Sequence, residues 1–189
     1  MNRPTARLVS ALLLFLCSTA LYGQQIAVKS NLLYDATSTF NLGIETGLSS
    51  RWSLDFSASY NPWTFSGNKK MKHFFVQPEV RYWFCETFNG HFVGAHLIGG
   101  VYNVGGVTLP GLNKDYRYEG TMLGAGLTYG YQWMIGKRWS IEAALGVGYV
   151  YTKYDKYECK HCGDKLESKQ KNGFLTPTKA AFSIVYFIK

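Results

Sequence analysis

The sequence is poor in charge, in proline and in long apolar runs. Only 17% of the 189 residues are charged, against about 25% in an average soluble domain, which excludes a disordered or coiled-coil chain. Beyond the N-terminal segment no stretch approaches the 18 consecutive apolar residues that predict a transmembrane helix. No stretch repeats its apolar residues every 3.6 positions between capping residues, so we expect no helix after that segment.

Aromatic residues and glycine are abundant instead. The chain holds 14 Tyr, 12 Phe, 5 Trp and 20 Gly, a composition that favours strands and turns over helices. The formal net charge is +8, but the basic residues do not gather on one stretch, so the charge does not indicate a nucleic-acid-binding protein.

Residues 1–23 have the pattern of a secretory signal peptide. Two arginines precede a short apolar run, and small or polar residues follow it: Arg3 and Arg7, then Leu8–Cys17, then the residues up to Gln24. We expect cleavage after Gly23, with Ala20 as the alternative. Acylation of Cys17 is less favoured, because Leu16 stands where lipoprotein signals have a small residue. Residues 24–189 then form one domain.

The mature chain predicts eight strands separated by turn residues. Their approximate ranges are Ile26–Leu33, Phe40–Leu48, Trp52–Asn61, Lys72–Phe84, Phe92–Val104, Tyr118–Ile135, Trp139–Tyr154 and Thr176–Ile188. Pro78 and Pro177 fall inside two of these ranges, and we expect each near a bulge or a strand start, because proline cannot donate to a ladder.

Within the strands, bulky apolar residues alternate with small or ionisable ones. In the third strand, for example, Trp52, Leu54 and Phe56 share one face, while Ser53 and Asp55 share the other. A soluble lipocalin-type barrel would turn the apolar face inward around a ligand, whereas a membrane barrel turns it outward against lipid.

Three features favour the outward orientation. The polar face is rich in glycine and serine, which suit a crowded interior, and aromatic residues lie at both ends of the apolar face, as at membrane interfaces. The third feature is connection length: short turns at 49–51, 85–91 and 136–138 alternate with longer loops at 62–71, 105–117 and 155–175, and only the first hairpin is short on the long-loop side.

We therefore predict an all-β fold, an eight-stranded up-and-down antiparallel transmembrane barrel with a filled polar lumen. Its place would be the bacterial outer membrane, with both termini and the short turns on the periplasmic side. A secreted lipocalin-like carrier is the alternative, and it would keep the mature chain soluble without detergent.

Three segments resemble a Bacteroidota outer-membrane barrel family of unknown function. They are Lys29-Ser30-Asn31-Leu32-Leu33-Tyr34-Asp35-Ala36-Thr37 with Asn41-Leu42-Gly43-Ile44-Glu45, then Val76-Gln77-Pro78-Glu79-Val80-Arg81-Tyr82-Trp83 with Asn89-Gly90-His91-Phe92-Val93-Gly94, and finally Cys162-Gly163 with Thr176-Pro177-Thr178-Lys179-Ala180-Ala181. The resemblance implies a surface protein, sometimes linked to fimbria-type operons, and no established activity.

The inward face should carry a polar network. Its members by strand parity are Lys29, Glu45, Asp55, Glu79, Arg81, His96, Gln132, Glu142 and Lys179. Buried charges must pair, because an unpaired buried ion costs several kcal/mol. The main interpretation is a salt-bridge plug that includes Glu79 and Arg81 and closes the lumen; a narrow proton or ion path, or catalysis by paired carboxylates, are the alternatives.

The predicted loop 155–175 holds the remaining candidates. Cys159 and Cys162 favour a disulfide outside the cytosol, with free thiols or a metal site shared with another chain as alternatives; together with His161 they offer at most three of the four ligands of a zinc site. Cys85 is expected at the periplasmic end, too far from this loop to pair with them.

The same loop is the expected partner surface. Its basic and aromatic residues, among them Tyr157, Lys160, His161 and Lys165, suit lipopolysaccharide phosphates or an acidic partner, such as a surface-appendage or envelope protein. We expect no nucleic acid, no cofactor, no metal and no enzymatic activity. The alternative is a small outer-membrane enzyme acting on lipid, which needs a lipid-facing nucleophile and base that the sequence does not supply.

Overall fold

A computed structural model describes residues 25–65, 69–106, 116–157 and 165–188. The elements are β1 (Ile26–Asn31), α2 (Leu32–Ala36), β2 (Phe40–Gly47), β3 (Trp52–Asn61), β4 (Thr64–Phe65), β5 (Lys69–Trp83), β6 (Gly90–Gly105), β7 (Arg117–Met134), β8 (Trp139–Tyr157) and β9 (Lys165–Phe187). The predicted signal peptide and the residues Cys159, Lys160, His161 and Cys162 lie outside the described residues.

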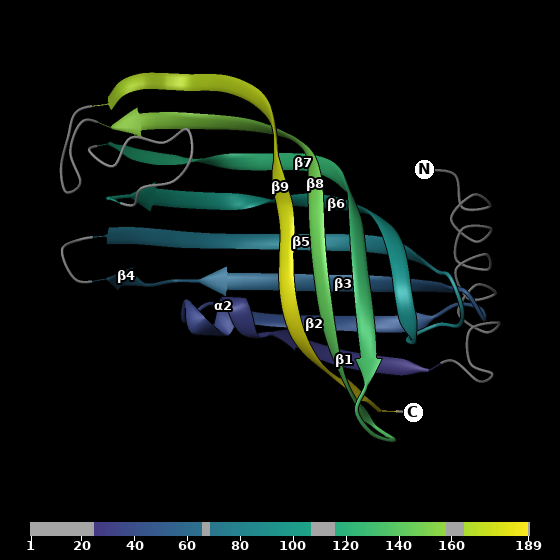
Figure 1. Cartoon of the computed structure of the whole chain (residues 1–189). Helices are drawn as coiled ribbons and strands as arrows, with labels where there is room; N and C mark the ends of the chain where they lie inside the picture. The colour runs from purple at the N-terminus through teal and green to yellow at the C-terminus, as the bar shows by residue number, and fades with distance from the viewer. Residues whose placement is uncertain (1–24, 66–68, 107–115, 158–164, 189) are drawn as a thin grey trace, which may run out of the picture.

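Eight antiparallel strands follow one another in up-and-down order and close a ring (Figure 1). The order is β1, β2, β3, β5, β6, β7, β8 and β9, and β9 pairs again with β1, while the two-residue strand β4 only extends the pairing of β5. This arrangement confirms the predicted all-β fold and strand order.

The ring is staggered, as a closed sheet of tilted strands requires. One row of directly paired residues runs through Phe187, Ala27, Glu45, Asp55, Glu79, His96, Gly126, Gly148 and Thr176. Following it once around the ring therefore returns to β9 eleven residues away, from position 187 to position 176. Part of this offset is the bulge beside Pro177, where the β8–β9 register shifts.

The apolar face points outward, as predicted. Leu127 is 68% exposed and Leu145 72%, and the rings of Phe56 and Trp133 are also exposed. The alternate residues point into the ring, where Asp55 is only 1% exposed. Because side chains alternate along every strand, this orientation places the bulky apolar residues outside all around the sheet and the polar ones inside.

The prediction of no helix after the N-terminal segment is wrong. One turn of helix, α2, follows β1, and the Asn31 side chain caps it by accepting a hydrogen bond of 3.1 Å from Leu33 N. Five residues are too few to show a helical period, so the sequence pattern could not reveal this turn. Within the described ranges, no helix is long and apolar enough to cross a membrane.

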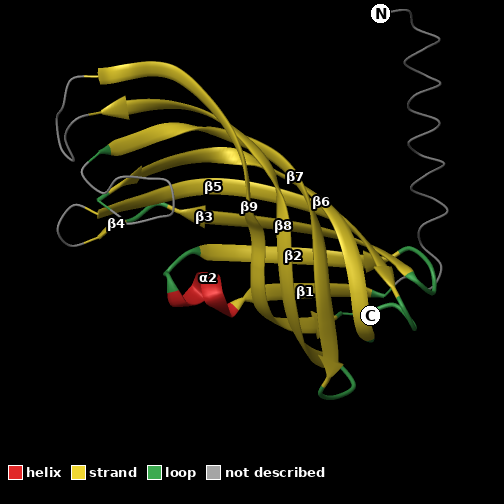
Figure 2. Ribbon diagram, turned by 45° about the horizontal axis from the view of Figure 1, so that its top comes forward, coloured by secondary structure: helices red, strands yellow, loops and turns green. Residues whose placement is uncertain are grey.

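The long loop predicted at 155–175 is mostly strand instead. β8 continues to Tyr157 and β9 begins at Lys165, with irregular pairing near Lys156. In the sequence of this hairpin polar residues stand at both parities, such as Asp155 and Lys156, so the alternation that revealed the other strands is absent. Figure 2 shows β5 to β9 projecting at one end beyond the shorter hairpin of β1 and β2.

Proline positions agree with the expectation in one case. Pro177 pairs with Val147 beside the bulge that leaves Thr178 without a direct partner on β8. Pro78 is not at a bulge: it pairs with Phe56 on β3, while the β5–β6 ladder is interrupted there without a change of register. In both places the ladder on one side of the proline is irregular or interrupted, so the backbone N–H that proline lacks is not required for pairing.

At the end with the short turns, the interior is apolar rather than polar. The buried cluster there comprises Ala27, Trp83, Phe88, Phe92, Ala144, Ala181, Val185 and Phe187. Phe88 lies in the turn between β5 and β6, where its φ of 69° directs the phenyl side chain into the open end of the strand ring. The side chain is only 2% exposed there. The Trp83 ring lies beside it at a tilt of 52°, with ring centroids 5.9 Å apart, and donates a hydrogen bond of 2.8 Å to Ser53. We call these eight residues the apolar floor.

Candidate functional site

The polar interior begins with three carboxylates on neighbouring strands. Glu45 on β2 lies directly opposite Asp55 on β3, and Asp55 lies opposite Glu79 on β5. Each is at most 1% exposed. Like charges directly opposite one another destabilise a sheet, so this row requires cations from elsewhere in the ring.

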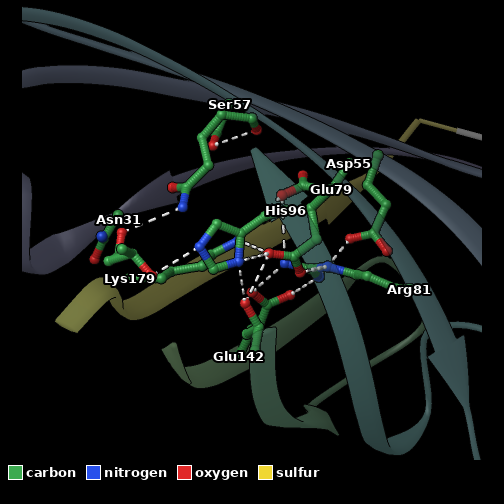
Figure 3. Close-up of polar contacts among 12 residues, drawn as sticks. Asn31, Asp55, Ser57, Glu79, Arg81, His96, Glu142 and Lys179 are labelled. Atoms are coloured by element: carbon green, nitrogen blue, oxygen red, sulfur yellow. Dashed lines mark hydrogen bonds and ion pairs between the residues drawn. The ribbon is translucent and has the colours of Figure 1, made fainter. Parts of the chain in front are cut away.

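Arg81 supplies the central cation. Its Nε lies 2.6 Å from Glu79, and its Nη1 lies 2.9 Å from Glu45 and 2.7 Å from Glu142, which reaches in from β8. Its Nη2 contacts Glu142 at 3.1 Å and Asp55 at 3.3 Å. The guanidinium therefore touches all four buried carboxylates, two of its hydrogen bonds going to Glu142 (Figure 3).

Two lysines supply the other cations. Lys29 Nζ lies 2.5 Å from Glu45, 3.1 Å from Glu142 and 3.2 Å from Asp55. Lys179 Nζ lies 2.9 Å from Glu79 and 3.4 Å from Asp55. We call these seven residues, four carboxylates and three cations, the ion network; its formal charge is −1.

His96 joins the ion network through hydroxyl groups. Thr128 Oγ1 donates to Glu79 at 3.0 Å, and His96 Nδ1 lies 2.8 Å from the same Oγ1. Because that hydroxyl hydrogen is already used, His96 Nδ1 must carry a hydrogen and donate it. Its Nε2 lies 2.8 Å from Thr178 Oγ1. A Cβ on Gly126 would meet His96 Nε2 at 2.7 Å, so glycine there leaves room for the imidazole.

The structure thus brings eight of the nine inward candidates together and leaves one apart. Gln132 is buried, but its amide donates to Ser140 at 2.6 Å and makes no contact with the ion network among the described interactions. Of the loop candidates, Tyr157 lies outside the ring, with the Arg117 guanidinium 4.3 Å from its ring centre. The Lys165 side chain, like Cys159, Lys160, His161 and Cys162, is not among those the structure describes.

Sequence analysis missed several partners of the network. Ser53 donates to Glu45 at 2.5 Å, and Thr128 links Glu79 to His96. The alternation already places both on the inward face with the charged residues, and only their part in the network was not predicted. Thr178 could not be placed in this way, because the bulge beside Pro177 shifts the parity of β9.

A second polar cluster fixes the turn α2 to the sheet. Asp35 accepts hydrogen bonds from Ser30 at 2.9 Å and from Asn41 at 2.7 Å. Asn31 reaches across to β9, where its amide donates to Ala180 O at 3.0 Å. All four polar residues belong to the first of the segments that carry the family resemblance, and Asn31 bonds the backbone of β9, so that segment codes for a structural closure at the β1–β9 seam.

The space left inside the ring is small. A cavity of about 40 Å³ lies between the ion network and α2, lined by Lys29, Tyr34, Asp55 and Lys179 among others. A water molecule needs roughly 10–15 Å³ measured in this way, so the cavity accommodates a few waters and no organic substrate. Among the described residues, no group of three or more His, Cys, Asp or Glu side chains could hold a metal ion.

One protein family matches nearly the whole sequence. The family described as "Protein of unknown function (DUF3575)" matches residues 9–188. The chain belongs to this family. The DUF3575 description carries no activity, and neither the curated proteins nor the solved structures include a match to the chain. A functional argument for this DUF3575 protein therefore depends on its own geometry.

Proposed function

We propose that this DUF3575 protein is an eight-stranded outer-membrane β-barrel that acts as a surface structural or interaction protein. The observation that carries the proposal is the outward belt of bulky apolar side chains around a charged interior. Water-soluble monomers rarely expose contiguous apolar patches larger than a few hundred Å², whereas Leu123, Leu127, Leu145 and Leu175 each have more than 60% of their surface exposed here.

The height of the belt fits a bilayer. On β8 the outward apolar residues run from Trp139 to Tyr151, and the next outward residue is Lys153. At a strand tilt near 45° and a rise of about 3.4 Å per residue, that stretch covers roughly 28 Å. The outward apolar band of outer-membrane barrels is about 25 Å tall. Trp139 and Tyr151 then lie at the two interfaces, where amphipathic rings are favoured.

A secreted lipocalin-like carrier is less well supported. Such a carrier holds its ligand in an apolar interior, but the middle of this ring is occupied by the ion network and its end by the apolar floor. The cavity beside the ion network, of about 40 Å³, is far below the several hundred Å³ of a typical ligand pocket. The same filling argues against a wide diffusion channel and supports a structural role for the ion network.

The described residues also do not supply the catalytic groups that a lipid-modifying enzyme needs. The most suggestive exposed pair is His91, whose Nδ1 lies 2.7 Å from the Tyr129 hydroxyl at the short-turn end. No carboxylate orients this imidazole among the described contacts, and no serine accompanies it. General-base catalysis needs a nucleophile, a base and an orienting group in one arrangement, so this pair does not favour an enzyme.

The working part in this proposal is the end where β5 to β9 project. Beyond the belt these strands carry Lys72, Glu119, Lys153 and Lys171 on their outward faces, a surface suited to lipopolysaccharide or to a surface-appendage or envelope protein. This end faces the cell exterior, and both termini face the periplasm. The link to fimbria-type systems and to Bacteroidota rests on the sequence resemblance.

Fractionation and gel migration test the membrane assignment. We expect the full chain to sediment with outer membranes and to migrate differently on a gel before and after boiling, as folded barrels do. Recovery of the mature chain in the detergent-free soluble fraction, with unchanged migration, would overturn the proposal. For the interaction role, pull-downs from intact membranes should lose specific partners when residues 156–170 are deleted, and identical partners in both would contradict it.

A further inference from the structure

Two lysines lie directly opposite each other on the outer surface of the β8–β9 hairpin. Lys153 on β8 is the pairing partner of Lys171 on β9, and both are exposed. Directly opposite residues share a face with Cβ atoms about 5 Å apart, and like charges in that arrangement are unfavourable. On the other side of Lys153, the adjoining residue of the same row is Thr121 on β7.

The described part of the chain does not neutralise this pair. Neither lysine makes an ion pair there, although an exposed ion pair nearby does form, between Arg117 and Glu119 at 3.2 Å. On the same outward face, Glu119 and Asp155 form the next pair along β7 and β8, and both carboxylates already have partners, so neither offsets the charge of the lysine pair by an ion pair with it. An anion that bridges Lys153 and Lys171 would offset their mutual repulsion.

The pair lies immediately above the apolar belt. Tyr151 lies on the same face as Lys153, two residues closer to the middle of the belt, and Tyr149 lies two residues further on. Both rings are exposed. Opposite Tyr151 is Gly173, where an added Cβ would collide with the Tyr149 hydroxyl. Glycine at 173 thus lets a tyrosine ring lie across β9 directly beneath Lys171, so that charge, aromatic rings and apolar residues follow in sequence down the wall.

We propose that Lys153 and Lys171 form a binding site for a phosphate group of a membrane glycolipid. The inference rests on the proposed membrane location, because it is the bilayer that places lipid phosphates at the height of the upper aromatic residues. Two ammonium groups supply charge-assisted hydrogen bonds to a phosphate monoester, the Thr121 hydroxyl adds a neutral donor in the same row, and Tyr149 and Tyr151 contact the sugar and the upper acyl carbons. A free phosphate ion shares the headgroup chemistry but gains nothing from the rings.

Binding to refolded protein in zwitterionic detergent micelles tests this site. The probes are bisphosphorylated lipid A, its dephosphorylated form and inorganic pyrophosphate. We expect lipid A to bind most tightly and to lose affinity by about fivefold for each lysine replaced in Lys153→Gln and Lys171→Gln, since one basic residue near an anionic surface is worth about that much. Dephosphorylation should remove the dependence on both lysines. Pyrophosphate should bind weakly, but with the same dependence on them.

Two further variants make the result unambiguous. Lys137→Gln removes an exposed charge from the turn at the opposite end and should leave lipid A affinity unchanged. Lys153→Glu turns the like-charged pair into an opposite-charged one, so it should abolish phosphate binding while raising the midpoint of unfolding, which separates loss of the site from loss of the fold.

Equal lipid A affinity for wild type and both lysine variants, or for phosphorylated and dephosphorylated lipid, would overturn the inference while leaving the membrane assignment intact. A mature chain that is soluble without detergent would instead overturn the proposed function, and the pyrophosphate titration would still decide whether the lysine pair binds phosphate.

Discussion

Replacing Arg81 with methionine is the most direct perturbation of the ion network. Methionine keeps much of the volume over the Phe92 ring, which the guanidinium contacts at 4.4 Å, but removes the charge and every hydrogen bond. Four carboxylates then face two lysines, and the formal charge of the interior falls from −1 to −2. Arg81 is fully buried, so water cannot take over its role.

The magnitude follows from the cost of leaving buried ions unpaired. Breaking a buried ion pair by removing one partner costs about 3–5 kcal/mol, a large part of the 5–15 kcal/mol that stabilises a typical domain. With a urea dependence of about 2 kcal/mol per molar, we expect the unfolding midpoint of Arg81→Met to fall by about 2 M. The exposed substitution Arg138→Met should change stability by less than about 0.5 kcal/mol.

Urea unfolding in micelles, followed by tryptophan fluorescence and by the gel shift of the unboiled protein, measures this difference. A second substitution isolates the ion pair. Glu142 accepts two of the hydrogen bonds of Arg81 and keeps only its ion pair with Lys29 in Arg81→Met, so Glu142→Gln in that background removes one excess negative charge and should restore about 1–3 kcal/mol. A midpoint of Arg81→Met within 0.5 M of wild type, or no recovery in the double variant, would refute the view of the ion network as a paired, mutually dependent plug.

Three further substitutions test the packing around the network. Gly148→Ala places a Cβ against the backbone carbonyl of Ala125, so it should lower the free energy of unfolding by about 1–3 kcal/mol. Gly136→Ala is the control, because the space around Gly136 is open and the added Cβ should cost nothing. Equal unfolding midpoints for the two variants would show that the strands move apart at Gly148. Phe88→Ala should cost about 3 kcal/mol and shift the emission of Trp83, which the apolar floor shields from water; unchanged emission would mean that another side chain closes that mouth.

The alternation of side chains made most of the fold predictable from sequence. The third strand was predicted with the same ends, Trp52 and Asn61, that the structure gives it. Such accuracy is possible because each strand here has one exposed face of bulky apolar residues and one buried face of small or polar residues, so hydrophobicity changes with every residue. The inward placement of Glu79 and Arg81 followed from the same parity, since one wrong step would expose a charge and bury a large apolar ring.

The parts that sequence could not predict are those that depend on distant contacts. Phe88 lies in a turn, and no local sequence signal indicates that its positive φ will direct the phenyl side chain into the open end of the strand ring. The α2 turn depends on Asn31 and Asp35 finding partners on β9 and β2. The projecting hairpin lacks alternation in its sequence because polar residues occupy both parities, as Asp155 and Lys156 do.

Burying the ion network costs desolvation free energy that an apolar filling would not cost. We infer that the network is useful because it determines the strand register. Apolar side chains of equal volume are often as stable as buried ion pairs or more so, but they pack acceptably in more than one register. Glu45, Asp55 and Glu79 contact their cations only when their three strands are correctly aligned. A shift of one strand by two residues leaves each side chain on the same side of the sheet but separates the opposite charges.

We therefore expect a variant whose ion network is replaced throughout by apolar and amide residues to stay folded but to lose a single register. Cysteines introduced at the directly paired positions Ser57 and Gln77, with the native cysteines replaced by serine, measure this by the yield of one cross-linked product. The yield should be high with the network present and lower without it, even though the free energy of unfolding stays within a few kcal/mol of that of the wild type. Equal yields would mean that the bulge at Pro177 and the turns alone determine the alignment, and that the charges contribute only through the pairs they form.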